Sequence, residues 1–400
     1  MKKLRNIISK PWAIVALLVL FSVVASTQSI LRSPKQYTYN GENYTQTHYN
    51  NYVIFKSSFH HLQNNQDLYC LHLDEHWDLF KYTPTFAAFF GIFAYMPDWL
   101  GLNMWNLLNV LLLVLAVYYL PQPMDRYKKG LLLVICAIEL LTSIQNAQSN
   151  AIIAGLSVLA FGLLENKKYL CATLCIVAST YIKLFGIVGF ALFLIYPKKL
   201  RSALYSLMWA VVLFAIPLIF VGWEQYNFLL SSFISMLGSD HDASYGYSVL
   251  GWLHTWFGWN GNKFTIVGIG ALLFMLPFAA TKEYDNFTFK AKILSSLLIW
   301  IVIFNHKAES PTFIIAMVGV AIWFILSEKN WANCILFTLA FVFTTLSPTD
   351  IFPRSFRENI VNPYCLKGVA CILVWAKINL DFALEYIRKR EVEKTNEIAE

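Results

Sequence analysis

Charged residues are scarce in this sequence. They make up 14% of its 400 residues, whereas hydrophobic residues make up 57%, and the mean hydropathy is +0.51. Soluble domains carry about 25% charged and about 45–50% apolar residues, so this chain has too little charge to cover a globule of its size. The shortage excludes a soluble enzyme and a disordered chain. It predicts an all-α polytopic membrane protein.

Cysteine pairs at the spacing of metal or redox motifs are lacking as well. The 7 cysteines include no C-x-x-C pair, and most of them lie in apolar runs, where they are expected to act as small hydrophobic residues. Only Cys70 and Cys365 fall in predicted polar loops, and a disulfide between them is left open, without support from their spacing. Basic runs interleaved with aromatic residues are lacking too. The net charge of +7 therefore indicates membrane orientation and not nucleic-acid binding.

Apolar runs are abundant in the sequence. The first, 11–27, follows the basic start MKKLRNIISK and is interpreted as an uncleaved first helix and not a signal peptide. Several later runs are shorter than the ~20 residues that cross a bilayer straight, so roughly 10–13 transmembrane or half-crossing helices are expected. These later runs lie at about 84–96, 102–120, 131–144, 151–164, 170–196, 202–221, 264–280, 293–304, 311–326, 332–345 and 366–379.

The positions of Lys and Arg predict the topology. Most of the 31 fall in the N-terminus, in short loops and in the tail, which the positive-inside rule places in the cytoplasm. Residues 29–83, 222–263 and 346–365 then lie on the non-cytoplasmic face. Residues 1–380 are expected to form one domain of a multi-pass protein of the bacterial inner or plasma membrane, and 381–400 a cytoplasmic tail. The Trp-rich segment 222–263 fits either an aromatic belt or a sugar- or lipid-binding cap.

The first large loop, 29–83, holds most of the titratable side chains that could act on the non-cytoplasmic side. Five of the 8 His lie there, together with Asp67, Asp74, Glu75 and Asp78. Their spacing matches no metalloprotease or zinc motif, so no metal site is predicted. A loop carboxylate that accepts the proton of an acceptor hydroxyl is the favoured interpretation.

Lys183 lies near the centre of the apolar run 170–196. Both flanks of that run are basic and assigned to the cytoplasm, and 27 residues cannot cross a membrane twice as full helices. Two short helices with a break near Lys183 are therefore expected. An ammonium group at membrane depth needs an anionic partner, and lipid phosphate is the favoured one. The alternative is a lysine that reaches the headgroups.

Two polar segments interrupt the apolar pattern elsewhere. The hinge IQNAQSNAI, 144–152, offers Gln148 and Asn150, whose amides can cap broken helix ends and bind a sugar or phosphate. The turn FNHKAESPTF, 304–313, offers His306, Lys307 and Glu309, followed by a Ser-Pro helix start. An ordinary polar turn is the alternative at both places.

The order of these segments resembles glycosyltransferase family 87 of the GT-C superfamily. The resemblance covers most of residues 12–345 and rests on the order of FKYTPTFAAFF, GLNMWNLLNVLLL, QNAQSN, ENKKYLCATLCIVASTYIKLFG, PKKLR, GYSVLGWL and HKAESPTF. It implies a multi-spanning enzyme that moves a sugar, often mannose, from a polyprenyl-phosphate donor to a lipid or glycan acceptor on the non-cytoplasmic face. No cofactor is implied.

The resemblance also assigns roles to residues. Lys183 matches the family's lysine after a run of small residues, which implies lipid-phosphate binding, with Lys81 or Lys307 as helpers. Gln148 and Asn150 match a G-Q-x-N motif in which Ala147 replaces the glycine. Family members usually carry an early loop Asp where this chain has Asn50 and Asn51, and an amide cannot accept a proton as a carboxylate does.

The missing loop Asp leaves three interpretations open. In the first, another acid serves as base in a hexosyltransferase, with Asp78 preferred because it is closest to the KYTP segment, and Asp67 and Glu75 as alternatives. In the second, the chain transports a lipid-linked sugar, although no internal repeat is visible. In the third, it is a catalytically silent member that binds lipid carriers. His306, Glu309, Asn50 and Asn51 are expected to contact substrate, beside Gln148 and Asn150.

Overall fold

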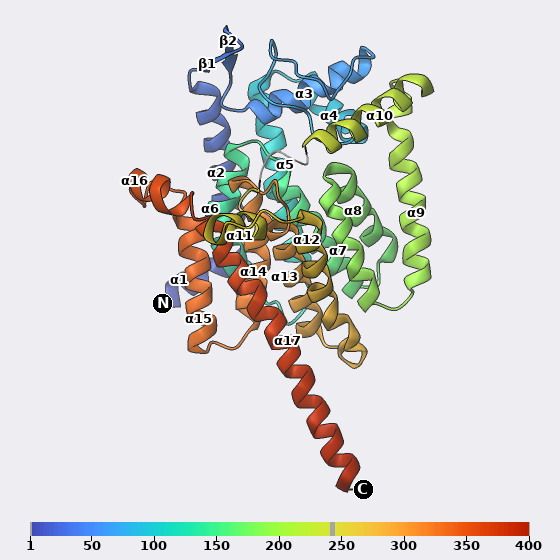
Figure 1. Cartoon of the computed structure of the whole chain (residues 1–400), viewed down its shortest axis with the longest axis vertical. Coiled ribbons are helices and arrows are strands. Elements are labelled where there is room, and N and C mark those ends of the chain that lie inside the picture. Colours follow the sequence, from blue (N-terminus) through green and yellow to red (C-terminus); the bar gives the residue numbers. More distant parts are fainter. Residues whose placement is uncertain (1, 241–244, 400) are drawn as a thin grey trace. The chain divides into compact units, whose positions relative to one another are not determined.

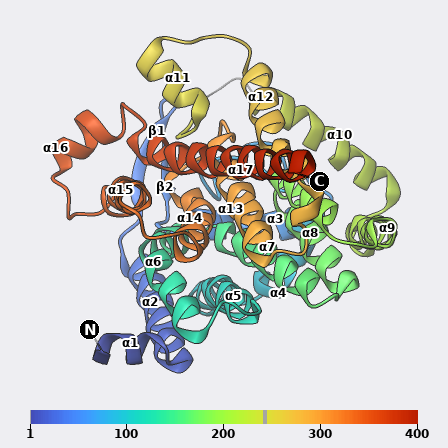
Figure 2. The same cartoon turned by 90° about the horizontal axis from the view of Figure 1, so that it is seen from below.

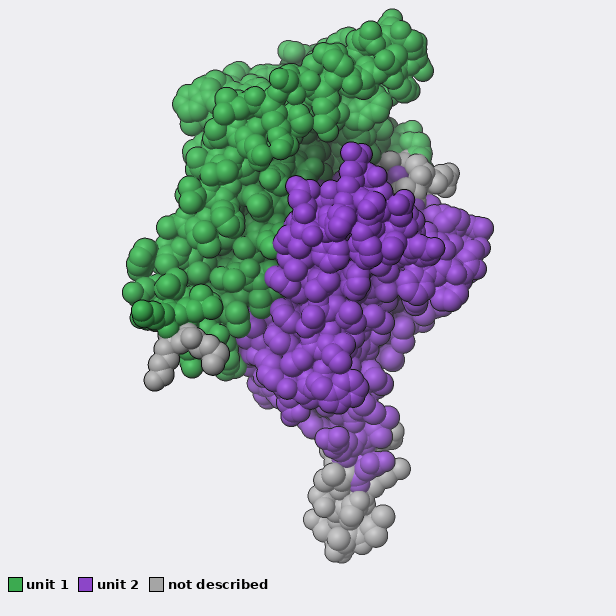
Figure 3. Space-filling model, turned by 90° about the vertical axis from the view of Figure 1, so that its left-hand side faces the viewer, with its two compact units in different colours: residues 1–189, 198–244 green, residues 190–197, 245–400 purple. Residues whose placement is uncertain are grey.

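The computed structural model describes residues 2–240 and 245–399. The chain divides into two compact units, of which unit 1 comprises Met1–Gly189 and Lys198–Ser244 and unit 2 comprises Phe190–Pro197 and Tyr245–Glu400 (Figure 3). Helices make up almost all of the described structure, and the single sheet within the described residues has two strands. The prediction of an all-α protein is confirmed.

Unit 1 is built mainly from helices, with a short hairpin after the first long helix (Figure 1). Its elements are α1 (Lys2–Ile8), α2 (Pro11–Leu31), β1 (Lys35–Tyr39), β2 (Glu42–Gln46), α3 (Asn50–Gln63), α4 (Pro84–Ala94), α5 (Asp98–Tyr119), α6 (Arg126–Gln145), α7 (Asn150–Glu165), α8 (Tyr169–Ile182), α9 (Lys199–Ala215), η2 (Ile216–Ile219) and α10 (Trp223–Asp240). The 3₁₀ helix η1 (Leu184–Ile195) begins in unit 1 and ends in unit 2.

Unit 2 has a core of α13 and α14 with the long α17 packed on them (Figure 2). Its elements are α11 (Val249–Phe257), α12 (Lys263–Met275), η3 (Leu276–Ala279), η4 (Thr281–Glu283), α13 (Phe287–Ile303), η5 (Ser310–Thr312), α14 (Phe313–Leu326), α15 (Trp331–Leu339), η6 (Ala340–Leu346), α16 (Arg354–Phe356), η7 (Arg357–Val361) and α17 (Leu366–Ala399). Helix α17 runs without a break through residue 381, where the tail was expected to begin.

Every predicted apolar run forms helix. The run 84–96 forms α4, and the run 170–196 splits into α8 and η1, as expected for a broken helix. Helix α4 begins where the sequence predicts, because Thr83 accepts a hydrogen bond from the main-chain N–H of Phe86 and Pro84 occupies the first turn. None of the seven cysteines, all of which lie in the described residues, is part of a disulfide, so the pair Cys70 and Cys365 is not bridged.

Three helices of the described chain are long and apolar enough to cross a membrane. They are Pro11–Leu31, Asp98–Tyr119 and Lys199–Ile219, with mean hydropathies of 2.3, 1.9 and 2.1. The last of them is only 17% buried within the protein, and it exposes Leu204, Leu207 and Val211. Exposed apolar side chains along a full-length helix fit a lipid environment. The chain is therefore an all-α membrane protein in which many apolar helices are shorter than a full span.

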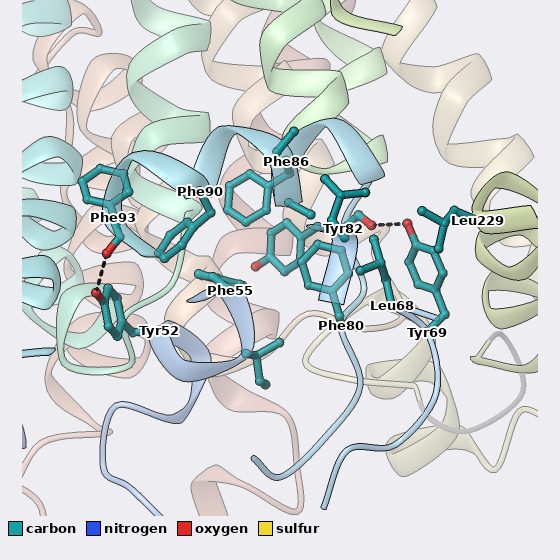
Figure 4. Packing of buried hydrophobic residues seen from close by; sticks show 14 of the residues in the cluster. Tyr52, Phe55, Leu68, Tyr69, Phe80, Tyr82, Phe86, Phe90, Phe93 and Leu229 are labelled. Carbon is teal, nitrogen blue, oxygen red and sulfur yellow. Dashed lines mark hydrogen bonds between the residues drawn. The ribbon is translucent and has the colours of Figure 1, made fainter. Parts of the chain in front are cut away.

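The first large loop is ordered, as predicted. It folds into the β1–β2 hairpin and α3, and these elements lie with α4 and α10 at one end of unit 1 (Figure 1). Beneath them, aromatic side chains of α3, α4 and the connecting segment form a core (Figure 4). The ring of Phe55 lies 4.8 Å from that of Tyr82 and 5.0 Å from that of Phe86. This core fixes the segment that ends in Tyr82.

Candidate functional site

Lys183 lies at a break between two short helices, as predicted. Helix α8 ends at Ile182, η1 begins at Leu184, and Lys183 itself has extended backbone angles of φ −138° and ψ 130°. An interrupted helix leaves main-chain polar groups and a side chain free to face a cavity, which is where such breaks are tolerated in membrane proteins.

Two glycines let η1 fold back on α8. A Cβ atom added at Gly186 would lie 2.6 Å from the carbonyl carbon of Ser179, and one added at Gly189 would lie 3.2 Å from Cγ2 of Ile176. The first contact involves main chain, which cannot move aside, whereas the second involves the end of a flexible side chain. Gly186 is therefore required for the turn that presents Lys183.

We expect Gly186→Ala to destabilise the protein by about 1–3 kcal/mol, the usual cost of overpacking. Gly189→Ala serves as the matched control and should cost less, because Ile176 can change rotamer. Thermal unfolding of both variants in detergent measures the difference. Equal melting temperatures for the two variants would show that the close approach at Gly186 is not structurally important.

The polar hinge connects α6 and α7 through a left-handed residue. Ala147 has φ +50°, and the main-chain N–H groups of Ala147 and Gln148 donate to the carbonyls of Ile144 and Ser143. This pattern is the Schellman motif, in which the left-handed position is usually glycine. The replacement of the motif's glycine by Ala147 therefore leaves the backbone path of the hinge intact.

The fold brings Lys183 together with both amides of the hinge. Its Nζ atom donates to Oδ1 of Asn150 at 2.8 Å and to Oε1 of Gln148 at 3.2 Å. Oε1 of Gln148 also accepts from the hydroxyl of Tyr82 at 3.1 Å, and the Tyr82 ring lies 5.3 Å from the ammonium group. These four residues, Lys183, Gln148, Asn150 and Tyr82, form a lysine–amide cluster.

The cluster has the character of an anion site. Gln148 and Asn150 are buried and Lys183 is half-buried, and both amide oxygens that accept from its ammonium group are uncharged. Nδ2 of Asn150 is buried without a hydrogen-bond partner among the described residues. Asn150 is also the first residue of α7, whose N-terminal N–H groups favour a negative ligand.

The two asparagines at the start of α3 connect this cluster to the loop carboxylates. Nδ2 of Asn51 donates to the carbonyl oxygen of Asn146 in the hinge at 2.9 Å. Asn50 pairs with the main chain of Trp77 in both directions, because its Nδ2 donates to the Trp77 oxygen at 2.6 Å and its Oδ1 accepts from the Trp77 N–H at 3.0 Å. The residue after Trp77 is Asp78. Asn50 is therefore hydrogen-bonded to the residue that precedes Asp78.

Of the three acids predicted as the base, Asp78 has the most exposed side chain. It lies in the left-handed region at φ +77°, its side chain is 50% exposed, and Oδ1 lies 3.2 Å from Nζ of Lys81. Tyr82 is four positions further along the chain, so the two Cα atoms are at most about 14 Å apart along the extended chain. Lys81 is thus placed beside Asp78 and next to the cluster residue Tyr82.

The other two acids have structural partners. Both carboxylate oxygens of Asp67 accept from the hydroxyl of Ser232 on α10 at 2.9 Å, and Oδ1 also accepts from the Tyr69 N–H. Burial raises the pKa of Glu75, but hydrogen bonds from His61 and Ser57 outweigh it, so the pKa of this carboxyl is lowered. A lowered pKa makes a weaker base, which leaves Asp78 as the preferred acid.

A comparison with family models matches glycosyltransferase family 87 over residues 80–304, more than half of the chain. The chain belongs to glycosyltransferase family 87. Among curated proteins, no match was found. The family match includes Lys81, Lys183, Gln148 and Asn150, begins just after Asp78, and ends just before the His306 turn. Family 87 membership supports a membrane glycosyltransferase that acts on a sugar donor and an acceptor.

The remaining predicted residues of this family 87 protein lie in unit 2. His306 and Lys307 are half-buried and Glu309 is exposed, in the turn between α13 and α14, and the Ser-Pro pair begins η5 as predicted. The segment GYSVLGWL packs against this turn: the Tyr247 N–H donates to the Ala308 oxygen at 2.9 Å. A Cβ atom at Gly246 would lie 2.8 Å from the His306 oxygen. Two segments of the family pattern thus meet in unit 2.

Tyr82 is the site residue that sequence reasoning did not identify. It stands inside the quoted segment FKYTPTFAAFF, one residue before the cap of α4. Its carbonyl oxygen accepts from the Tyr69 hydroxyl at 3.0 Å (Figure 4). The next residue, Thr83, donates to the Tyr181 carbonyl close to the helix break. The start of α4 is visible in the sequence, and another element of the fold must hold it in place. In the structure that element is α8.

Proposed function

We propose that this family 87 protein is a hexosyltransferase that moves a mannose-like sugar from a polyprenyl-phosphate donor to a lipid or glycan acceptor. The transfer takes place on the non-cytoplasmic face of a bacterial inner or plasma membrane, with the N-terminus in the cytoplasm. The lysine–amide cluster is the observation that carries this proposal. A lysine held at a helix break by neutral oxygens, beside a helix N-terminus, suits a phosphate on a lipid chain.

The proposed reaction is a single displacement with inversion. The acceptor hydroxyl oxygen attacks the anomeric carbon, and a new C–O bond forms as the bond from that carbon to the phosphate oxygen breaks. The electron pair of the broken bond leaves with the polyprenyl phosphate, whose charge Lys183 offsets. The hydroxyl proton passes to a carboxylate. Fixed charge at the leaving group is commonly the largest single contribution to such catalysis.

Asp78 is proposed as that carboxylate. The pairing of Asn50 with Trp77 supports it, because the resemblance leads us to expect an acid where Asn50 stands and Asp78 follows Trp77. Asn51, which contacts the hinge, connects the same end of α3 to Gln148 and its cluster. Lys81 is proposed as a second cation for the donor phosphate. His306, Lys307 and Glu309 are proposed to contact substrate from unit 2.

A turnover assay in liposomes tests the function. The purified chain is offered radiolabelled polyprenyl-phosphate mannose, glucose or arabinose, with a membrane lipid extract as acceptor. We expect transfer from the mannose donor to an extractable glycolipid or glycan. Donor binding without transfer from any of the three would instead support a catalytically silent carrier-binding protein. Movement of the intact donor between leaflets would support a transporter.

A further inference from the structure

Two histidines and one glutamate converge in the first large loop, and none of the three has a role in the proposed reaction. They are His61 on α3 and His72 and Glu75 in the segment between α3 and α4. Each offers one ligand atom, and these three atoms all lie within 4.8 Å of one another. The spacing along the chain matches no zinc motif, so this convergence comes from the fold alone.

The geometry of the group fits a single small cation. Nε2 of His61 lies 3.0 Å from Oε1 of Glu75, and the rings of His61 and His72 are stacked with centroids 3.8 Å apart. Two ligands at about 2.1 Å from a tetrahedral ion are separated by about 3.4 Å, and from an octahedral ion by about 3.0 Å. The separation between His61 and Glu75 is of this size and the three ligand atoms all lie within 4.8 Å, so an ion can enter once the side chains draw closer.

The environment of the two histidines favours metal binding. The His61 side chain is only 4% exposed, so this ligand is already withdrawn from water. Nε2 of His72 lies 2.9 Å from the Asp67 carbonyl oxygen, the kind of partner that orients metal-binding histidines.

We propose that His61, His72 and Glu75 form a binding site for a transition-metal cation of the Zn²⁺ class. Two imidazoles and one carboxylate are a ligand set that suits Zn²⁺, whereas Mg²⁺ and Ca²⁺ prefer oxygen ligands. The ion would fasten the segment between α3 and α4 to α3 itself. Its role is structural, and the proposal does not depend on the chemistry of sugar transfer.

The test is metal content and affinity, measured on the full chain in detergent. After treatment with a chelator and its removal, the chain is titrated with Zn²⁺ and, separately, with Mg²⁺. We expect about one Zn²⁺ per chain, no competition from Mg²⁺, and a rise in the melting temperature on Zn²⁺ binding. Co²⁺ substituted for Zn²⁺ should give the visible absorption of a nitrogen- and oxygen-bound ion.

The variants His61→Gln and His72→Gln should each weaken Zn²⁺ binding by at least about 100-fold. His60→Gln is the matched control, because His60 is the next residue on α3 and its ring packs against Tyr95 instead. His72 lies in the loop, so its variant keeps the test valid if His61→Gln does not fold. Absence of Zn²⁺ binding in the parent chain would overturn the proposal. Equal binding in the parent and the two site variants, or equal loss in His60→Gln, would overturn it as well.

Discussion

Replacing Asp78 with asparagine is expected to lower the rate of sugar transfer by at least about 10²-fold, since a positioned general base contributes typically 10²–10⁴-fold. Asparagine keeps the size of the side chain and tolerates the left-handed backbone, φ +77°, that this position requires. The change therefore removes the proton acceptor and leaves the loop conformation unchanged. The measurement is the single-turnover rate in liposomes at saturating donor, beside an unchanged melting temperature.

Asp67→Asn is the matched control for this prediction. It removes another carboxylate from the same loop, but one that is bonded to Ser232 and to the Tyr69 N–H. We expect it to reduce stability by about 1–3 kcal/mol, the cost of weakening hydrogen bonds to a charged group, with little effect on the rate constant of the folded protein. A full rate in Asp78→Asn together with a lost rate in Asp67→Asn would transfer the role of base to Asp67.

The helix break at Lys183 was predictable from the length of the apolar run around it. An apolar run of 27 residues between two basic segments is too long for one crossing and too short for two, and the structure resolves the conflict with α8 and η1. The hinge at Gln148 and Asn150 was visible for a similar reason, as a polar interruption of an apolar pattern. The local sequence pattern and the length of a segment are sufficient to predict its structure where a membrane permits few backbone conformations.

The contacts between these segments were not predictable from the same signals. Nothing in the spacing of Asn50 and Trp77, 27 positions apart, indicates that their polar groups pair. The convergence of His61, His72 and Glu75 was missed for the same reason, because metal motifs are recognised by spacing within one element and this group depends on how a loop returns to α3. Tertiary proximity set by packing of aromatic side chains, such as Phe55 on Tyr82, leaves no periodic trace in the sequence.

The structure gives a physical reason for the two asparagines that stand where the resemblance predicts an early loop Asp. From sequence alone, Asn50 and Asn51 are substitutions that argue against activity. In the fold, Asn50 holds the main chain of Trp77 and Asn51 holds the hinge, so both amides use donor groups that an aspartate lacks. Each asparagine thus holds a main-chain segment in place, and the proposed base Asp78 follows the Trp77 that Asn50 binds.

The second large effect is expected at Lys183. Lys183→Met keeps most of the apolar stem and removes the ammonium group, and we expect the affinity for polyprenyl phosphate to fall at least about tenfold. A hydrogen bond to a charged group contributes about 1.5–3 kcal/mol, and 1.4 kcal/mol corresponds to a factor of ten. The rate of transfer should fall further, because the charge on the leaving phosphate is greatest after the bond breaks. Equilibrium binding of the phosphorylated carrier and the single-turnover rate measure the two effects separately.

Lys168→Met provides the control that isolates the site from the residue type. Lys168 precedes the other end of α8 and lies 5.5 Å from the ring of Tyr119, much as Lys183 lies 5.3 Å from that of Tyr82, but it is exposed and has no amide partners from the hinge among the described contacts. A lysine over a tyrosine ring is therefore present in both places, and only one is held by Gln148 and Asn150. If both variants lose affinity equally, general membrane charge and not the lysine–amide cluster binds the phosphate. If only Lys183→Met loses it, the pair of amides at the helix break is what turns an ordinary lysine into a phosphate site.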